Sequence, residues 1–359
     1  MEYIYQLPLG MSSKDVSEKQ HVLEDGLNIK NKTFQWKISD ILSLKFDRTI
    51  VKQLKDIGEK PTKERKQIEI DFDGMLLIRV YNHGLLEQYT WDESYVKSDS
   101  WSVPIGHTRS RLIRHDFDKY KHLIIAGATG YGKSAILKMI ITNLVLQQPK
   151  NTNLHLIDLK GGSAFQRFKD LSQTKSFTRE PKEAKDILKT IQEQMKNTYS
   201  EIVDKGYEDI KESGKKERHF IIIDEAADIA DDAAAMEVIT DVARRGRGAG
   251  YYIIYATQYP SSQSIPQQTK RNIPARLCFV LDDATASQTA LGQTGAESLP
   301  MIPGRGIYKN VKTQVVQTPF ITNEEIKIQI APFIRRNKEV TSIEKPKENR
   351  SNSFELEEM

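Results

Sequence analysis

Short apolar runs alternate with amphipathic stretches between residues 121 and 316. Apolar positions three and four residues apart over residues 136–145 and, after Pro181, over residues 187–195 predict two helices. Strands that alternate with helices favour an α/β fold with a parallel central sheet covered on both faces. Five β-rich runs supply the expected strands: His122–Ala126, Leu154–Asp158, Phe220–Asp224, Tyr251–Ala256 and Arg276–Leu281.

The beginning of the chain has a different pattern, which predicts a small α+β domain over residues 1–103. Apolar positions within residues 38–54 are spaced for one or two helices. Residues 68–80 form two alternating or apolar runs, and these predict two strands joined by a turn at Asp73-Gly74. The stretch Ser98–Gly106 then reads as a linker to a second domain.

The rest of the chain predicts one larger domain over residues 104–334 and a disordered tail over residues 335–359, which is charged and poor in aromatic residues. A length of 359 residues, 38% of them hydrophobic, suits two domains with at least one large core. The single cysteine excludes a disulfide framework, and the apolar runs are too short to span a bilayer. A net charge of +4 is compatible with an anionic partner. We therefore expect a globular protein of the cytoplasm.

Residues 127–134 fit the phosphate-binding pattern G-x-x-x-x-G-K-[ST], between an expected strand and an expected helix. Glycines let the backbone N–H groups cradle phosphate oxygens at the positive end of the helix. We expect Lys133 to reach the β- and γ-phosphates and Ser134 to bind Mg²⁺. A glycine-rich turn without a ligand is the alternative. The expected nucleotide-binding residues are Gly127, Ala128, Thr129, Gly130, Tyr131, Gly132, Lys133 and Ser134.

Two acidic residues follow the apolar run that begins at Phe220. Asp224 is placed to hold Mg²⁺ through its water shell, and Glu225 can orient and deprotonate a water that attacks the γ-phosphate. In isolation such a pair would be read as a solvated strand end or a helix N-cap. Its expected position in the same sheet as the phosphate loop favours the catalytic interpretation. We expect the nearby Asp228, Asp231 and Asp232 to lie at the start of the next helix.

Gln258 follows another expected strand. Because ligands of parallel sheets bind beyond the carboxyl ends of the strands, Gln258 would project beside the γ-phosphate and report its presence. A surface position that leads into the turn at Tyr259-Pro260 fits the sequence equally well.

Arginines gather in Arg244-Arg245-Gly246-Arg247, and Arg271 and Arg276 flank the following strand. An arginine supplied across a subunit interface can stabilise charge on a transferring phosphate. Basic loops can also neutralise DNA phosphates. A solvated helix end is the third reading. The first two are favoured for the cluster as a whole, and the sequence singles out no one arginine.

Six motifs in order between Pro104 and Lys309 resemble the motor domain of the FtsK/SpoIIIE family of DNA translocases. They are His122–Gly127, which runs into the phosphate loop, Ile157–Lys160, Ile223–Asp228, Ala256–Pro260, Asn272–Arg276, and Gly295–Glu297 with Met301–Gly306. Residues 20–100 resemble, more loosely, the domain that precedes the motor in that family.

The resemblance implies a RecA-like P-loop fold and a homo-oligomeric ring, expected as a hexamer. It also implies hydrolysis of ATP, stimulated by DNA, and movement of double-stranded DNA through the central channel. By position it assigns ATP and Mg²⁺ binding to Lys133 and Ser134, hydrolysis to Asp224 and Glu225, γ-phosphate sensing to Gln258 and a trans-acting role to Arg276.

The sequence departs from the family pattern in three respects. Membrane-spanning segments and a C-terminal DNA-reading winged helix are not found, and Gln288 stands where the family has an arginine. These features favour a small translocase of a mobile element, recruited to the membrane by a partner. Two alternatives stay open. One is a conjugative coupling protein that delivers relaxase-bound DNA to a membrane transfer protein, and the other is an ATP-gated DNA clamp with little turnover.

Overall fold

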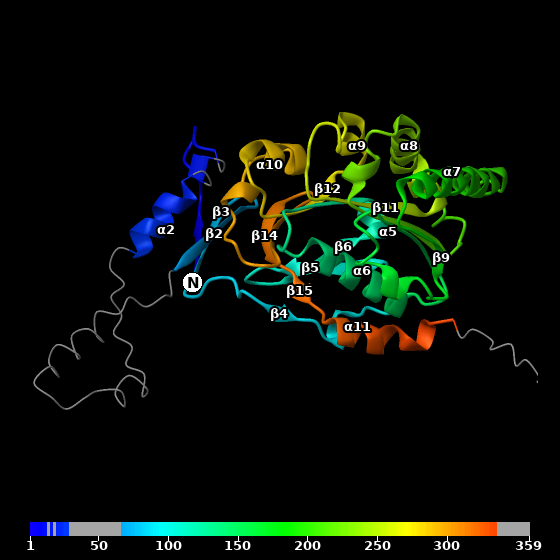
Figure 1. Ribbon diagram of the computed structural model, residues 1–359. Coiled ribbons are helices and arrows are strands. Elements are labelled where there is room, and N and C mark those ends of the chain that lie inside the picture. The colour runs from blue at the N-terminus through cyan, green and yellow to red at the C-terminus, as the bar shows by residue number, and fades with distance from the viewer. Residues whose placement is uncertain (13–14, 17–18, 29–65, 336–359) are drawn as a thin grey trace, which may run out of the picture.

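The computed structural model describes residues 1–12, 15–16, 19–28 and 66–335. Within these ranges the main element is a ten-stranded sheet with the order β6-β5-β14-β13-β12-β7-β11-β10-β8-β9 (Figure 1). The strands from β12 to β9 in this order are parallel, and those from β13 to β6 pair antiparallel. The predicted α/β class is confirmed. The predicted parallel sheet is found in the strands from β12 to β9, and the antiparallel strands from β13 to β6 extend it beyond that prediction. The strands are β5 (Ser102–His107), β6 (Leu112–Asp116), β7 (Leu123–Ala126), β8 (Thr152–Asp158), β9 (Thr174–Thr178), β10 (Arg218–Asp224), β11 (Tyr251–Thr257), β12 (Ala275–Phe279), β13 (Arg305–Lys309) and β14 (Thr313–Gln317).

Helices cover both faces of this sheet (Figure 1). Two helices, α6 (Lys133–Gln147) and α11 (Asn323–Ile330), lie on one face. The other face carries α7 (Pro181–Asp204), α8 (Ala233–Ala249), α9 (Gln267–Asn272) and α10 (Ala284–Leu291). None of the helices in the described ranges is long and apolar enough to cross a membrane. The shorter elements between residues 82 and 335 are α5 (Phe117–Tyr120), β4 (Tyr89–Thr90), β15 (Pro319–Phe320), and the 3-10 turns η1 (Glu93–Tyr95), η2 (Gln166–Phe168), η3 (Ala226–Ile229), η4 (Ala296–Ser298) and η5 (Ala331–Phe333).

The alternation of side chains along the central strands divides the buried apolar residues between the two faces of the sheet, and a smaller third cluster lies around α10. In β10, Phe220 and Ile222 pack in the same cluster as the apolar residues of α6. The alternate residues Ile221 and Ile223 pack with α7 and α8 instead. Because successive side chains of a strand point to opposite faces, a continuous apolar run is what a strand covered on both sides requires.

Local signals in the sequence set the ends of the helices. Pro181 is the first residue of α7, where its missing N–H costs little. The side chain of Asp232 accepts hydrogen bonds from the first turn of α8, and Gly250 ends that helix with a φ of 77°. By contrast, α6 begins after Gly132 without a capping side chain. The N–H groups of its first turn are therefore available to an anion.

A small antiparallel sheet lies before the main one, with the order β1-β3-β2. Its strands are β1 (Glu2–Tyr5), β2 (Gln67–Phe72) and β3 (Leu76–Tyr81), and α2 (Gln20–Asn28) packs against β2. The predicted strand pair with its turn at Asp73-Gly74 is thus confirmed. The helices predicted within residues 38–54 lie outside the described residues, as do residues 336–359 of the predicted tail.

The expectation that Ser98–Gly106 is a linker is wrong, because most of this stretch belongs to β5. Val103 and Ile105 are fully buried in the main core, and the pairing of β5 with β6 shifts register between Pro104 and Gly106. Proline and glycine therefore mark a bulge in a buried strand here, not an exposed connection. The division of the chain at residue 103 stays a prediction.

Candidate nucleotide-binding and hydrolysis site

The phosphate loop joins β7 to α6 at the carboxyl end of the parallel strands. Gly130 and Gly132 have φ values of 89° and 113°, which residues with a Cβ atom rarely adopt. A Cβ atom on Gly127 would lie 2.7 Å from the Cβ of Phe279, and the Gly127 N–H donates to the carbonyl of Thr257 at 3.3 Å. The glycines are thus needed both for the backbone conformation and for the close approach of the neighbouring strands.

The side chains predicted to bind phosphate and metal meet at this loop. The amino group of Lys133 is buried, forms an ion pair with Oδ1 of Asp224, and lies 3.6 Å from Oε2 of Glu225. Oγ of Ser134 donates to Oδ2 of Asp224 at 3.4 Å. The hydroxyl of Ser134 and the carboxylate of Asp224 are oxygen donors of the kind that Mg²⁺ prefers. These residues therefore fit the predicted metal, and their roles stay predictions.

Glu225 and Gln258 are also brought into contact. Oε1 of Glu225 accepts hydrogen bonds from Oγ1 of Thr257 at 2.9 Å and from the backbone N–H of Gln258 at 3.1 Å. The side-chain Oε1 of Gln258 in turn accepts from Oγ1 of Thr129 in the phosphate loop at 2.6 Å. Gln258 is buried beside the loop, so the reading as a surface residue does not hold. Its role as a phosphate sensor stays a prediction.

A third carboxylate of the site was given no role in the sequence analysis. Asp158 ends β8 and stands in register with Asp224. Its Oδ2 accepts from the N–H groups of Ala164 and Phe165 at 2.9 Å each, while its buried Oδ1 has no partner among the described residues. Burial raises the pKa of Asp158, and the charge of Asp224 adds to this shift. The signal that could have found it is an apolar strand ending in Asp, as in β10.

The structure does not bring Arg276 to this loop. Arg276 lies in β12 opposite Ile124, before the strand reaches its carboxyl end. Its Nη2 donates to the carbonyl of Lys270 at 3.0 Å, and burial lowers the pKa of the guanidinium. A trans-acting role for Arg276, which would need a second copy of the chain, stays a prediction.

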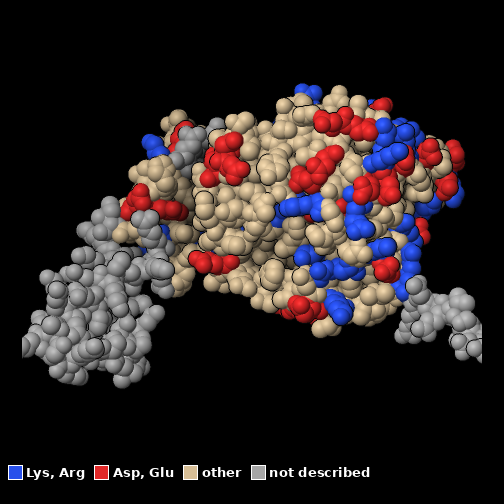
Figure 2. Space-filling view, in the orientation of Figure 1, with Lys and Arg blue, Asp and Glu red and all other residues tan. Residues whose placement is uncertain are grey.

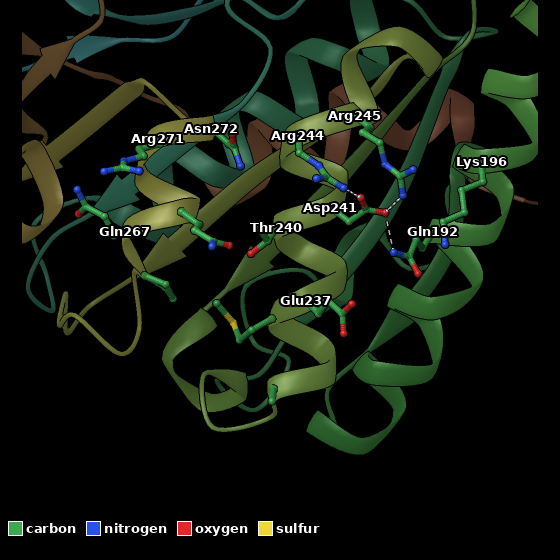
Figure 3. A pocket seen from close by; sticks show the side chains of 14 residues that line it. Gln192, Lys196, Glu237, Thr240, Asp241, Arg244, Arg245, Gln267, Arg271 and Asn272 are labelled. Carbon is green, nitrogen blue, oxygen red and sulfur yellow. Dashed lines mark hydrogen bonds and ion pairs between the residues drawn. The ribbon is translucent and has the colours of Figure 1, made fainter.

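Three of these arginines, Arg244, Arg245 and Arg271, line a separate cleft of about 860 Å³ between α7, α8 and α9 (Figure 3). The buried carboxylate of Asp241 accepts hydrogen bonds from Nη2 of Arg244 at 3.1 Å, from Nε2 of Gln192 at 2.7 Å, and from Nη2 of Arg245. Arg271 lies across the cleft on α9. In the space-filling view, Lys and Arg side chains gather at the end of the molecule where α7 and α8 lie, mixed with acidic ones (Figure 2). The cluster is thus exposed to solvent and fixed in part by one acid.

Two solved structures are similar in fold to this chain. The pCW3 conjugation coupling protein TcpA, solved with ATPγS, superposes with a TM-score of 0.63 at 23% identity, over 79% of this chain and 85% of its own. EssC (ATPases 2 and 3) from Geobacillus thermodenitrificans superposes with a TM-score of 0.62 at 17% identity, over 69% of this chain and 51% of its own. At these identities the likeness shows that the fold is shared.

Curated relatives are DNA translocases. The chain is 30% identical over 342 residues to the DNA translocase FtsK of Caldanaerobacter subterraneus subsp. tengcongensis, which covers 90% of this chain and 47% of that protein. It is 28% identical over 329 residues to the DNA translocase SpoIIIE of Bacillus subtilis, which covers 84% of this chain and 41% of that protein. The chain thus spans less than half the length of these relatives. Residues 85–222 match the FtsK/SpoIIIE family model. This part of the chain is thus an FtsK/SpoIIIE-type domain.

Proposed function

We propose that this chain is an ATP-dependent motor that moves double-stranded DNA. The observation that carries the proposal is the assembly of Lys133, Ser134, Asp224, Glu225 and Gln258 around one phosphate loop. These groups are the parts that phosphoryl transfer to water needs: a phosphate cradle, a cation, metal ligands and a base. The FtsK/SpoIIIE-type domain supports DNA as the substrate that the motor acts on.

Each residue of the site has a separate role in the proposed hydrolysis. The amino group of Lys133 exchanges its contact with Asp224 for the β- and γ-phosphates of ATP. Ser134 and Asp224 would hold Mg²⁺, which neutralises charge on the phosphate oxygens. Glu225 takes the proton of the attacking water, and Gln258 hydrogen-bonds the γ-phosphate. Each of these groups lies at the end of a strand or at the start of α6, so the sheet positions all of them at once.

The DNA-binding part of the proposal rests on charge as well as on family. The exposed arginines of α8 and α9 line an open cleft and can contact backbone phosphates without reading bases. We propose that the active form is a homo-oligomeric ring, a hexamer, in which Arg276 or an arginine of this cluster acts on the nucleotide of a neighbour.

A strand-displacement experiment tests the movement itself. A motor that travels along duplex DNA removes a third strand bound in its path, and it does so only while ATP is hydrolysed. We expect displacement by the wild type and none by Glu225→Gln, which keeps the phosphate cradle but lacks the base. If the wild type binds the duplex and ATP without displacing the strand, the protein is a clamp and the motor proposal fails.

A coupling protein for conjugative transfer is the second candidate. The printed title of the similar TcpA structure describes a conjugation coupling protein, and that fold match extends over 85% of its chain. This candidate shares the motor and adds a relaxase, with recruitment to the membrane through a transfer protein. Binding of a purified relaxase to this chain, measured by co-sedimentation, would favour it.

A further inference from the structure

Both oxygens of the Glu225 carboxylate already have partners. Oε1 accepts hydrogen bonds from Oγ1 of Thr257 at 2.9 Å and from the N–H of Gln258 at 3.1 Å. Oε2 accepts from the same N–H at 3.1 Å and faces the amino group of Lys133 at 3.6 Å. A general base needs a lone pair within reach of the proton that it takes. In this arrangement the Thr257 hydroxyl and the Gln258 N–H fix the orientation of the carboxylate and occupy part of its capacity to accept a proton from water.

Thr257 is well placed to restrain that carboxylate. It is fully buried at the end of β11, next to β10, whose last residue precedes Glu225. Its hydroxyl donates to Glu225 and accepts from the N–H of Tyr259 at 3.2 Å. Because the donor and an acceptor site of the hydroxyl are both in use, the Thr257 side chain is fixed in the orientation that holds Glu225.

The backbone conformation of Glu225 is also one that needs contacts to hold it. Its φ is 64°, in the left-handed region that residues with a Cβ atom rarely occupy. Such a conformation persists when the surrounding contacts over-determine it. The hydrogen bonds from Thr257 and Gln258 are contacts of this kind, because they fix the far end of the same residue.

Gln258 connects this restraint to the phosphate loop. Its backbone N–H holds the Glu225 carboxylate, while its side chain accepts from Oγ1 of Thr129 at 2.6 Å. A γ-phosphate accepts hydrogen bonds, so it would bind Nε2 of Gln258 and draw this side chain away from Thr129. That movement would shift the Gln258 backbone N–H and loosen its hold on Glu225.

We propose that Thr257 is a positioning residue that restrains the hydrolytic base Glu225. Engagement of the γ-phosphate by Gln258 relieves only the part of the restraint that the Gln258 N–H supplies, and the Thr257 hydroxyl still acts on Glu225 when ATP is bound. The inference rests on the proposed ATP hydrolysis and concerns its regulation. Glu225 has two positions, one held and one free, and the Thr257 hydroxyl sets the balance between them. Removal of the hydroxyl shifts the balance to the free position.

The test replaces Thr257 and measures steady-state ATP hydrolysis without DNA. Thr257→Val keeps the shape of the side chain and removes the donor, so kcat should rise about tenfold. KM for ATP should stay the same, because the Thr257 side chain contacts Glu225 and the backbone of Tyr259, not the phosphate loop. Thr257→Ser keeps the hydroxyl and should behave like the wild type. A merely structural role would lower kcat or leave it unchanged, and either result would overturn the proposal.

Two controls separate this inference from the proposed function. If Thr257→Val fails to fold in a thermal unfolding scan, Thr257→Ala removes the same donor and carries the same expectation. Wild-type hydrolysis that exceeds that of Lys133→Ala supports the ATPase, whatever the Thr257 variants do. If those two rates differ and Thr257→Val matches the wild type, the restraint alone is refuted. If neither the wild type nor the Thr257 variants hydrolyse ATP, both proposals fail.

Discussion

At the scale of single residues, Lys133 combines a buried structural contact with a proposed role in the chemistry of the site. Its amino group is buried in an ion pair with Asp224 and close to Glu225. A buried ammonium compensates two carboxylates that would otherwise lie together without a counter-charge. In the proposed mechanism the same amino group binds the phosphates of ATP. One substitution therefore tests both properties.

Lys133→Ala should abolish nucleotide binding and also lower the free energy of unfolding by about 3–5 kcal/mol, because it leaves buried carboxylates unpaired. A fluorescent ATP analogue and chemical denaturation measure the two effects. Lys138→Ala is the matched control, since this lysine lies later in α6 and its amino group contacts Asn323 at the surface. The control should stay within about 1 kcal/mol of the wild type. If both variants lowered the free energy of unfolding by the same amount, the stabilising role of the Lys133–Asp224 ion pair would be contradicted.

The residues of the site were predictable where a local motif carries the chemistry. The phosphate loop and the acids after Phe220 are contiguous in sequence, and the strands place them as expected. The restraint of Glu225 by Thr257 was not predictable, because it depends on the register of two strands and on a backbone angle. Asp158 ends an apolar strand, which is a signal that the sequence does contain, but its place beside Asp224 follows only from the pairing of β8 with β10.

At the scale of elements, the approach of α8 to β11 depends on a glycine. A Cβ atom on Gly246 would lie 2.5 Å from the carbonyl oxygen of Tyr251, which is backbone and cannot rotate away. This glycine was read in the sequence only as part of the arginine cluster. Its packing role could not be predicted, because the carbonyl that it meets belongs to the next strand, after the chain has turned at Gly250.

Gly246→Ala should therefore destabilise the protein by about 1–3 kcal/mol, although alanine favours a helix. Gly26→Ala is the matched control, because Gly26 lies in α2 and a Cβ there meets nothing within 4 Å. The control should leave the unfolding temperature unchanged or raise it. The packing argument is wrong if thermal unfolding shows Gly246→Ala to be as stable as the wild type.

At the scale of the whole molecule, buried histidines couple folding to pH. Burial lowers the pKa of His115, His122 and His155 to about 3 each, and of His219 to about 4. These side chains are neutral in the folded protein near pH 6, whereas an unfolded histidine takes up a proton below about pH 6.5. Between pH 6.5 and the lower pKa values of the folded protein, the unfolded state thus binds more protons than the folded state. The free energy of unfolding therefore falls as the pH drops through this range.

The free energy of unfolding should fall between pH 6.5 and pH 4, by up to about 1.4 kcal/mol per pH unit for each buried histidine. Above pH 7 these histidines should contribute no pH dependence. Denaturant titrations at several pH values measure the slope, and His219→Asn, which cannot titrate, should reduce it. A slope that His219→Asn leaves unchanged would mean that His219 is accessible to protons in the folded protein.

The sheet gathers residues from four strand ends and one helix start into a single site, and we propose that this site hydrolyses ATP to move duplex DNA. The most direct test is the ATP turnover of the wild type with duplex DNA, with single-stranded DNA and without DNA, measured with the oligomer mass in the same buffer. The account predicts an oligomer whose turnover duplex DNA raises at least about tenfold, about 1.4 kcal/mol of coupling, and a Glu225→Gln variant without turnover. A monomer that hydrolyses ATP at the same rate with and without duplex DNA would contradict it.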